Sequence, residues 1–264
     1  MSAISDVIGK SRKVVIKIGS NVLSNEEGLV NQATLHNIVE QAAAMIKQGK
    51  QVVIVSSGAT ICGVGTINKW GRKDDMNYKQ ALCAIGQVEL MRGYREYFAD
   101  YGIHVAQILL TSEDFEDPHR TLNIRNTLFT LIDEGVVPVI NENDTVSIDE
   151  FTIGDNDTLS ALTANLWNAD ALIALSDIDG VFDKDPKTHD DAKLIEKVED
   201  IKKLLGDIDT EGKSSFGTGG IKTKIRAAEI VNGMGIAMVL LNGKKRDIIK
   251  DAAEGSARGT LFQK

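Results

Sequence analysis

The sequence predicts an α/β fold, a three-layer αβα sandwich built around an open, mainly parallel sheet. Short apolar runs rich in β-branched residues alternate along the chain with longer segments of helical period. The apolar runs are nearly continuous, as in parallel strands that are buried on both faces. Only three prolines occur and no Ser/Gly-rich linker interrupts the alternation, so residues 1–264 are expected to form a single domain.

The strands of this sheet are expected at six short apolar runs, each of which is followed by turn or polar residues. They are, in chain order, residues 13–20, 51–57, 102–110, 135–141, 170–176 and 235–241.

Helices are expected in the segments between these runs. After Asn31, a residue type that caps helices, apolar side chains from Leu35 to Ile46 recur at the spacing of one helical face. The other expected helices are residues 78–99, 120–134, 158–168 and 222–232. Residues 147–154 alternate as in a small hairpin, and the polar residues 183–193 are expected to form a surface excursion.

Composition excludes several classes of function. The net charge of −8 argues against nucleic acid as the main partner, because a phosphate backbone is bound by a basic face. Cys62 and Cys83 form no CxxC pattern and are expected to be core residues in a reducing compartment. The histidines lack zinc-ligand spacing. Since no apolar run reaches membrane-spanning length and no signal peptide is recognisable, a cytoplasmic protein without a membrane partner is expected.

Polar and glycine residues follow several of the predicted strands directly. Because ligands bind at the carboxyl ends of parallel strands, these positions are the first candidates for a functional site. They are 17–20, 56–58, 141–144 and 176–177. Their repetition is the main functional signal in the sequence.

Two common nucleotide-binding motifs are absent from the sequence. GKS occurs at 9–11 and 212–214, but a Walker A loop needs a glycine where Ile4 and Asp207 stand. A dinucleotide fingerprint that starts at Gly217 fails because its third glycine position holds Lys222.

The stretch SSFGTGGIKTKIRAA, residues 214–228, is a glycine-rich turn that opens a helix. Free backbone N–H groups and the positive end of the helix dipole form an anion site there. Lys222 and Lys224 lie in the first turns, where lysine does not favour the helix by itself. A phosphate chain nearby would explain them, and the alternative is a flexible surface loop with solvated lysines.

Two further features match a phosphoryl-transfer site. Lys17 stands inside a strand of aliphatic residues, either as a lysine that reaches transferred phosphate oxygens or as one that extends to solvent from the sheet edge. Asparagines and aspartates crowd into INENDTV (140–146) and IGDNDTLSA (153–161). Helix capping is the alternative for the second cluster, but one such residue is enough for a cap. Carboxylates and amides could instead hold an amino group, orient a lysine or bind magnesium.

Taken together, the motifs resemble the glutamate 5-kinases, a branch of the amino-acid kinase superfamily. VVIKIGS, SSGA, INEND, GDND, LSDIDGVFDKDP and GTGGIKTK occur in that family's order, and the resemblance runs from about residue 13 to residue 262. It implies an open αβα sandwich that binds MgATP without a P-loop and phosphorylates the side-chain carboxylate of L-glutamate to glutamyl 5-phosphate, the first step of proline biosynthesis. Since the chain stops just after GTLF, no C-terminal PUA domain is expected.

The resemblance also implies roles for individual residues. Lys17 and Lys224 would neutralise charge on the transferred phosphoryl group, and Asp155 would orient the two lysines. Glutamate would be bound by Ser57, Asp144 and Asn156, with Asn141 and Asp157 close by. The nucleotide would lie against Lys17, Ser176, Asp177, Thr218, Gly219, Gly220, Ile221, Lys222, Thr223 and Lys224. No metal ligand is assigned.

The chemistry agrees with these roles. A carboxylate nucleophile is already ionised at neutral pH and needs no general base. Two anions must be brought together, and two lysines, backbone amides of a glycine loop and magnesium would relieve their repulsion. Asp144 could pair with the α-ammonium of the substrate while Ser57 and Asn156 hold its α-carboxylate.

The family also implies partners. Proline is expected to be a feedback inhibitor that competes near glutamate, and residues 70–87 correspond to a loop over the substrate site that contacts neighbouring subunits. A homo-oligomer, a dimer or a tetramer, is therefore expected. Functional coupling to glutamyl phosphate reductase, which would consume the product, is also possible.

Three other functions compete with this reading. A sister kinase would act on N-acetylglutamate, aspartate, carbamate or UMP, and the NEND and GDND motifs with IGQ at 85–87 disfavour it. A nucleotide-binding sensor without catalysis is disfavoured by the presence of both lysines and the acidic loops. An NAD-dependent oxidoreductase is disfavoured by the failed dinucleotide fingerprint.

Overall fold

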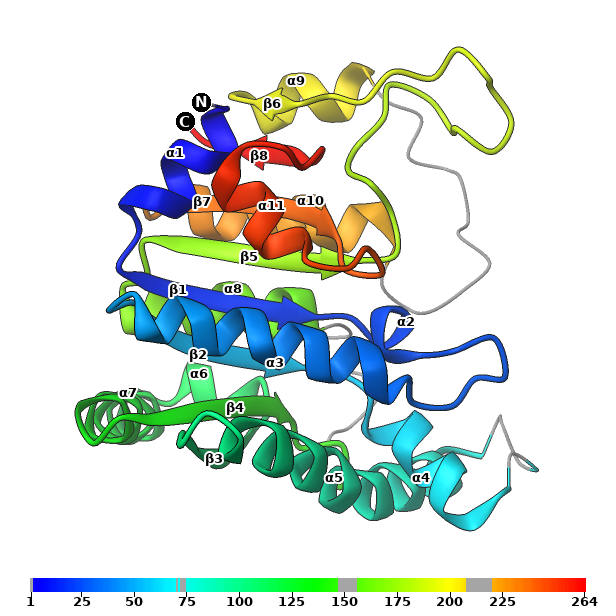
Figure 1. The fold of residues 1–264 in the computed structure, drawn as a ribbon, viewed down its shortest axis with the longest axis vertical. Helices are drawn as coiled ribbons and strands as arrows, with labels where there is room; N and C mark the ends of the chain where they lie inside the picture. The colour runs from blue at the N-terminus through cyan, green and yellow to red at the C-terminus, as the bar shows by residue number, and fades with distance from the viewer. Residues whose placement is uncertain (1, 70, 72–74, 147–155, 208–219) are drawn as a thin grey trace.

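The fold is an open eight-stranded sheet with helices on both faces, in a computed structural model that describes residues 2–69, 71, 75–146, 156–207 and 220–264 (Figure 1). The strand order is β3-β4-β2-β1-β5-β7-β8-β6. Neighbouring strands are parallel, except that β7 and β8 pair antiparallel. The predicted fold class is confirmed.

The six predicted strands are confirmed, each with boundaries shifted by at most a few residues. They are β1 (Lys13–Ile18), β2 (Gln51–Ser56), β3 (His104–Leu110), β4 (Val136–Glu142), β5 (Ala171–Ser176) and β7 (Ala237–Asn242). Sequence analysis missed β6 (Lys197–Val198) and β8 (Thr260–Phe262) at one edge of the sheet. Runs of two and three residues are too short to show a period.

The five predicted helices are also confirmed. They are α3 (Gln32–Lys47), α5 (Met76–Ala99), α7 (Pro118–Asp133), α8 (Asn156–Trp167) and α10 (Ile221–Asn232). Asn31 caps α3 as expected, because its side chain accepts a hydrogen bond from the backbone N–H of Thr34. The further helices are α1 (Ala3–Lys10), α2 (Ser20–Leu23), α4 (Ala59–Ile67), α6 (Glu113–Glu116), α9 (Ile201–Asp207) and α11 (Ile248–Glu254).

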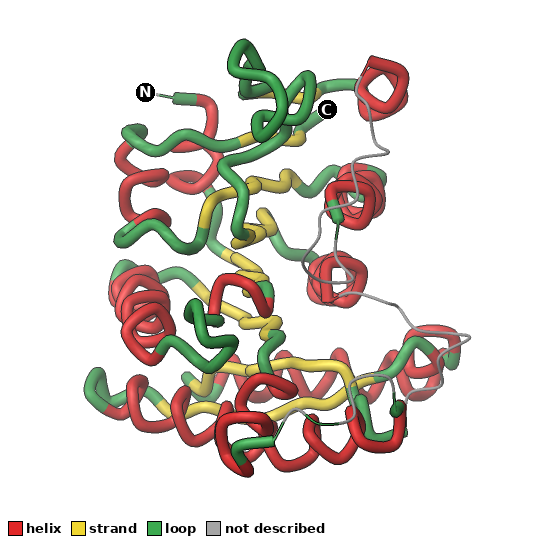
Figure 2. The backbone as a smooth tube through the Cα atoms, turned by 90° about the vertical axis from the view of Figure 1, so that its right-hand side faces the viewer, coloured by secondary structure: helices red, strands yellow, loops and turns green. Residues whose placement is uncertain are grey.

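Two hydrophobic clusters, one on each face of the sheet, join the strands to the helices that cover them. Figure 2 shows the resulting three layers, with helices on either side of the strands. Helices α1, α3, α5 and α11 cover one face of the sheet, and α7, α8, α9 and α10 cover the other. Within β1, Ile16 and Ile18 belong to the first cluster and Val15 to the second. Because side chains alternate along a strand, Lys17 lies on the face that α8 and α10 cover.

Two other segments of the chain were singled out from the sequence. Residues 183–193 are mostly exposed, as expected of a surface excursion, and its ends are joined by an isolated antiparallel bridge between Phe182 and Leu194. The hairpin expected at 147–154 lies outside the described residues. Among those described, no helix has the length and apolar character needed to cross a bilayer.

Candidate active site

The site residues lie where four adjacent parallel strands end. Strands β4, β2, β1 and β5 are neighbours in that order, so their carboxyl ends meet at one edge of the sheet. Asn141, Ser57, Lys17 and Ser176 stand at these ends. The backbone N–H of Ser57 donates to the Ile18 carbonyl at 3.0 Å, which continues the sheet register into the site.

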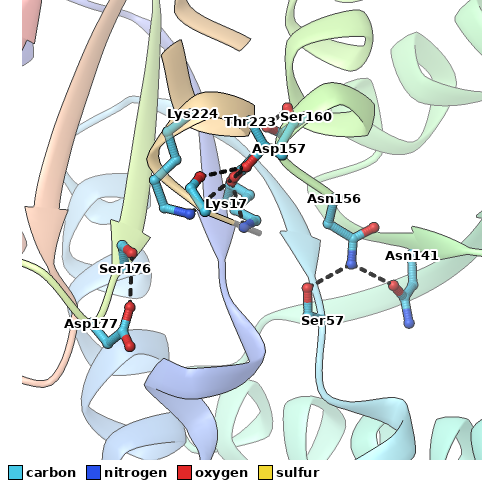
Figure 3. A network of polar contacts seen from close by, with 11 residues as sticks. Lys17, Ser57, Asn141, Asn156, Asp157, Ser160, Ser176, Asp177, Thr223 and Lys224 are labelled. Atoms are coloured by element: carbon cyan, nitrogen blue, oxygen red, sulfur yellow. Dashed lines mark hydrogen bonds and ion pairs between the residues drawn. The ribbon is translucent and has the colours of Figure 1, made fainter. Parts of the chain in front are cut away.

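Two lysines from opposite ends of the chain meet at one carboxylate (Figure 3). Lys17 Nζ lies 2.5 Å from Asp157 Oδ1, and Lys224 Nζ lies 3.1 Å from Asp157 Oδ2. The three side chains are 4%, 6% and 1% exposed for Lys17, Lys224 and Asp157 respectively, which rules out a lysine that extends to bulk solvent. The cluster therefore holds two ammonium groups and one carboxylate in a buried position.

Asp157, which was grouped with the substrate-binding residues from the sequence, contacts both lysines. Asp155, which was expected to orient the lysines, lies outside the described residues. Asp157 is the second residue of α8, and α8 packs over β1 on the face that carries Lys17.

Helix α10 supplies the rest of the cationic side of the site. Gly220 caps it, and the Thr223 hydroxyl lies 2.9 Å from Asp157 Oδ2 and 2.8 Å from the Gly220 carbonyl oxygen. Lys224 is buried, whereas Lys222 is exposed. Thr218 and Gly219 lie outside the described residues. Of the predicted nucleotide segment, the structure thus brings Thr223 and Lys224 to Asp157.

A chain of side-chain amides forms the other half of the site. Asn156 Nδ2 donates to Ser57 Oγ at 2.7 Å and to Asn141 Oδ1 at 2.9 Å. Asn141 Nδ2 donates in turn to Gln87 Oε1 at 2.9 Å. Asn141, Asn156 and Gln87 are all buried. We call these four residues, Ser57, Asn156, Asn141 and Gln87, the amide chain.

Asp144 lies in the loop after β4, next to the α5 side of the site. It is half-buried, and burial together with the charge of Glu142 raises the pKa of its carboxyl to about 6. Its neighbour on α5 is Cys83, a buried free thiol whose pKa is raised to about 12 by burial and by Asp144. A half-buried carboxyl group therefore lies beside the site, with a pKa that burial and a neighbouring carboxylate raise.

Ser176 and Asp177, which were predicted to bind the nucleotide, lie at the end of β5. Ser176 is buried and its hydroxyl lies 3.2 Å from Asp177 Oδ1, while Asp177 is exposed and accepts a hydrogen bond from Asn21 Nδ2 at 3.0 Å. Between β1 and Asn21 stands Gly19, where a Cβ would lie 3.7 Å from Lys17 Nζ. A residue without a side chain keeps the approach to that ammonium open.

Sequence analysis missed two residues that contact the site, Gln87 and Asn21. Gln87 lies in the expected helix 78–99 and also in the segment 70–87, which the family resemblance placed over the substrate site. Residues 76–87 form the first half of α5, and Gln87 is buried against Asn141. Its only sequence signal was its place in IGQ, and an isolated glutamine in a helical pattern does not indicate a site.

The described residues offer no protein cage for a metal ion. No group of three or more His, Cys, Asp or Glu side chains with ligand geometry occurs among them. Mg²⁺ is usually held by one or two carboxylates together with substrate phosphates and waters, so this donor set fits an ion that arrives with a nucleotide.

Comparisons with known proteins agree with this geometry. The profile of the amino acid kinase family matches residues 12–242. A glutamate 5-kinase of Alkaliphilus metalliredigens is 60% identical over 98% of this chain and 98% of its own length. One of Clostridium acetobutylicum is 43% identical over 95% of this chain and 94% of its own.

Solved structures share the fold at much lower identity. UMP kinase from Ureaplasma parvum superposes with a TM-score of 0.67 at 17% identity, covering 97% of this chain and all of that one. Isopentenyl phosphate kinase gives 0.65 at 17% identity over 95% of this chain and all of its own. The sheet order, the paired lysines and the sequence relatives lead to one conclusion: the chain belongs to the amino acid kinase family and, within it, to the glutamate 5-kinases.

Proposed function

We propose that this protein transfers the γ-phosphoryl group of ATP to the side-chain carboxylate of L-glutamate at the strand ends of β1, β2, β4 and β5. The product is glutamyl 5-phosphate, the first intermediate of proline biosynthesis. One observation carries the assignment of the site: the buried Lys17–Asp157–Lys224 cluster stands beside the amide chain, joined through the consecutive residues Asn156 and Asp157.

The cationic cluster prepares the site for the transferred group. Two ammonium groups lie together in a water-poor environment, where their charge acts strongly on nearby phosphate oxygens. Asp157 holds both lysines in place before the nucleotide binds, so little reorganisation is needed during the reaction. Lys17 and Lys224 then contact oxygens of the γ-phosphoryl group, where negative charge develops in the transition state.

The reaction needs no proton transfer. A carboxylate oxygen of glutamate forms the new bond to γ-phosphorus, and the bond from γ-phosphorus to the bridging oxygen of ADP breaks. Because the nucleophile is already ionised, the residues of this chain have to position it rather than deprotonate it. Mg²⁺ bound with the nucleotide neutralises part of the phosphate charge.

The amide chain and Asp144 recognise the amino-acid end of the substrate. Asp144 pairs with the α-ammonium group. Both N–H groups of Asn156 Nδ2 are already donated to Ser57 and Asn141, so its Oδ1 accepts from the α-ammonium group rather than binding the α-carboxylate, as the sequence had led us to expect. The Ser57 hydroxyl, which accepts from Asn156, donates to the α-carboxylate. Asn141 supports Asn156 through their hydrogen bond. A keto acid, which lacks the ammonium group, would leave the Asp144 carboxylate unpaired and bind more weakly.

The nucleotide lies along the strand end of β5 and the start of α10. Ser176, Asp177 and residues 218–224 form its side of the site, with the free N–H groups of the α10 N-terminus directed at its phosphates. Lys222, which is exposed, contacts the nucleotide only from the solvent side.

Trapping the acyl phosphate tests the function directly. Hydroxylamine converts glutamyl 5-phosphate to a hydroxamate, which is measured with MgATP and a panel of glutamate, N-acetylglutamate, aspartate, carbamate and UMP, alongside ADP release. Hydroxamate and ADP with glutamate alone are expected. Turnover with another acceptor and none with glutamate would make the protein a sister kinase. ATP binding without any turnover would make it a sensor.

The proposal extends to the setting of the enzyme. We assign the whole reaction to one cytoplasmic domain, residues 1–264, which assembles as a homo-oligomer, a dimer or a tetramer. Proline inhibits by competing at the glutamate side of the site, and the labile product is passed to glutamyl phosphate reductase. A proline dose series at several glutamate concentrations is expected to raise the glutamate KM without lowering kcat, and no effect of proline would remove the regulatory part of the proposal alone.

A further inference from the structure

Gln87 lies at the inner end of the amide chain, beyond the residues that the function requires. It is 8% exposed, and its Oε1 accepts from Asn141 Nδ2 at 2.9 Å. Asn141 then links it to Asn156 and Ser57. A substitution at Gln87 is therefore two hydrogen bonds away from Asn156, which is proposed to bind the amino-acid end of the substrate.

The direction of every hydrogen bond in the chain follows from one backbone group. The N–H of Glu142 donates to Asn141 Oδ1 at 2.9 Å, and a backbone N–H can only donate. This contact fixes which end of the Asn141 amide is the oxygen. Asn141 Nδ2 must then face Gln87, which has to present Oε1, and Asn141 Oδ1 must be met by Asn156 Nδ2.

This polarity leaves one donor and one acceptor buried and unused. Among the described residues, Gln87 Nε2 and Asn156 Oδ1 have no hydrogen-bond partner. Buried polar groups are almost always paired, so two orphans in one network require an explanation. The α-ammonium group of a bound amino acid would supply the donor that Asn156 Oδ1 lacks.

Gln87 is also held in place by an unusually close helix crossing. A Cβ at Gly86 would lie 1.8 Å from the Ala59 carbonyl oxygen, and a Cβ at Gly63 would lie 2.0 Å from that of Leu82. Helices α4 and α5 thus meet backbone to backbone at the residue before Gln87. The base of its side chain cannot move without separating the two helices.

We propose that Gln87 is a positioning residue for glutamate binding, which acts through Asn141 to hold the Asn156 amide in its binding orientation. The inference rests on the proposed function. It predicts that Gln87 affects the glutamate side of the site and leaves the nucleotide side, built from α10 and β5, unaffected.

The experiment compares Gln87→Met with Gln41→Met by steady-state kinetics in the hydroxamate assay and by thermal unfolding. Both glutamines are buried, and methionine keeps the shape while it removes both polar ends. Gln41 lies on α3 and accepts from the backbone N–H of Ile249 at 2.7 Å, so its replacement also breaks buried hydrogen bonds. Gln41 is therefore a matched control for loss of stability.

For Gln87→Met the KM for glutamate is expected to rise roughly 5- to 100-fold, the range for one lost buried hydrogen bond, with the KM for ATP within about twofold. Gln41→Met is expected to lower Tm and leave both KM values unchanged. An unchanged glutamate KM in Gln87→Met, or equal changes in both KM values, would refute a positioning role. If the wild type makes no hydroxamate from glutamate, both the proposed function and this inference are wrong.

Two further measurements separate positioning through Asn141 from a general packing effect. In an Asn141→Ala background, Gln87→Met should raise the glutamate KM by no more than about twofold, because the residue it acts through is gone. Gln87→Glu keeps an acceptor oxygen for Asn141 Nδ2 and should remain closer to the wild-type KM than Gln87→Met. If the KM increase in the double variant equals the product of the increases in the two single variants, the two residues act independently and the proposal is contradicted. This comparison holds even if Gln87→Met alone folds poorly.

Discussion

Replacing Asp157 by asparagine is the most direct test of the cationic cluster. The substitution keeps the size and shape of the side chain and removes its charge. Lys17 Nζ and Lys224 Nζ, 2.5 and 3.1 Å from its two oxygens, would then lie buried beside an uncharged amide. Whichever way that amide turns, one lysine faces an NH₂ group, which cannot accept a hydrogen bond from it.

The magnitude follows from the burial of all three groups. Removing one partner of a buried ion pair costs about 3–5 kcal/mol, because the remaining charge is left uncompensated. In a domain of this size, 1 kcal/mol corresponds to a Tm change of about 2–4 °C. The nucleotide-free Asp157→Asn variant should therefore unfold roughly 6–20 °C below the wild type.

Nucleotide binding should restore part of this loss. Phosphate oxygens can take the place of the missing carboxylate, so saturating MgATP is expected to raise the Tm of the variant by more than it raises that of the wild type. The kcat of Asp157→Asn is expected to remain about 10²–10³-fold below that of the wild type, because the lysines are no longer held in their catalytic orientation. Thermal unfolding with and without MgATP and the hydroxamate assay measure these quantities.

A surface ion pair provides the matched control. Lys184 Nζ lies 2.6 Å from Asp191 Oδ2, with side chains 34% and 77% exposed. A pair of this kind contributes about 0–1 kcal/mol, so Asp191→Asn should leave both Tm and kcat nearly unchanged. If Asp157→Asn behaves like Asp191→Asn, the buried cluster does not orient the lysines and the reasoning is wrong.

Other predictions concern the two lysines, the substrate carboxylate and the helix crossing. Lys17→Ala and Lys224→Ala should each lower kcat about 10²–10³-fold while circular dichroism shows a retained fold, and a loss under threefold would remove that lysine from the mechanism. Because Asp144 must be ionised to pair with an ammonium group and its pKa is raised to about 6, kcat/KM for glutamate should fall as pH drops below about 6. For Asp144→Asn, kcat/KM for glutamate should be low at every pH and should no longer fall below about pH 6. If the variant keeps the same fall in kcat/KM at low pH, another group is responsible for it. Gly63→Ala should cost about 1–3 kcal/mol or more in denaturant unfolding, because its Cβ would lie 2.0 Å from a carbonyl oxygen. Gly65→Ala on the same helix, with its nearest neighbour at 3.5 Å, should be neutral or stabilising, and equal effects at the two glycines would contradict the close crossing.

The sequence was most informative where a local pattern determines the structure. The strands around Lys17 and Asn141 are nearly pure aliphatic runs, and their polar ends mark the edge of the sheet where ligands bind. The motif order gave the family, and the comparisons confirm it. Local pattern also located the helix capped by Asn31 to within one residue.

The contacts inside the site could not be read from local pattern. The contact of Asp157 with both lysines depends on the direction of its side chain at the start of α8, which the local sequence does not show. Gln87 on α5 reaches Asn141 on β4 across 54 positions, and the glycine that precedes it lies at the close crossing of α4 and α5. Such pairs are set by tertiary packing, which a single sequence does not encode in any short window.

The start of α8 connects the two halves of the site. Successive residues on a helix point about 100° apart, so Asn156 and Asp157 face different neighbours from almost the same place. Asn156 turns to the amide chain on the α5 side of the strand ends, and Asp157 turns to the lysines on the α10 side. The amide chain and the lysine cluster are therefore joined by one peptide unit, and in the proposed mechanism this peptide unit contributes to the spacing of the acceptor amino acid and the phosphoryl group. A one-residue insertion between Asn156 and Asp157 would keep every side chain of the site but turn one of the two away, and activity should be lost even if both substrates still bind.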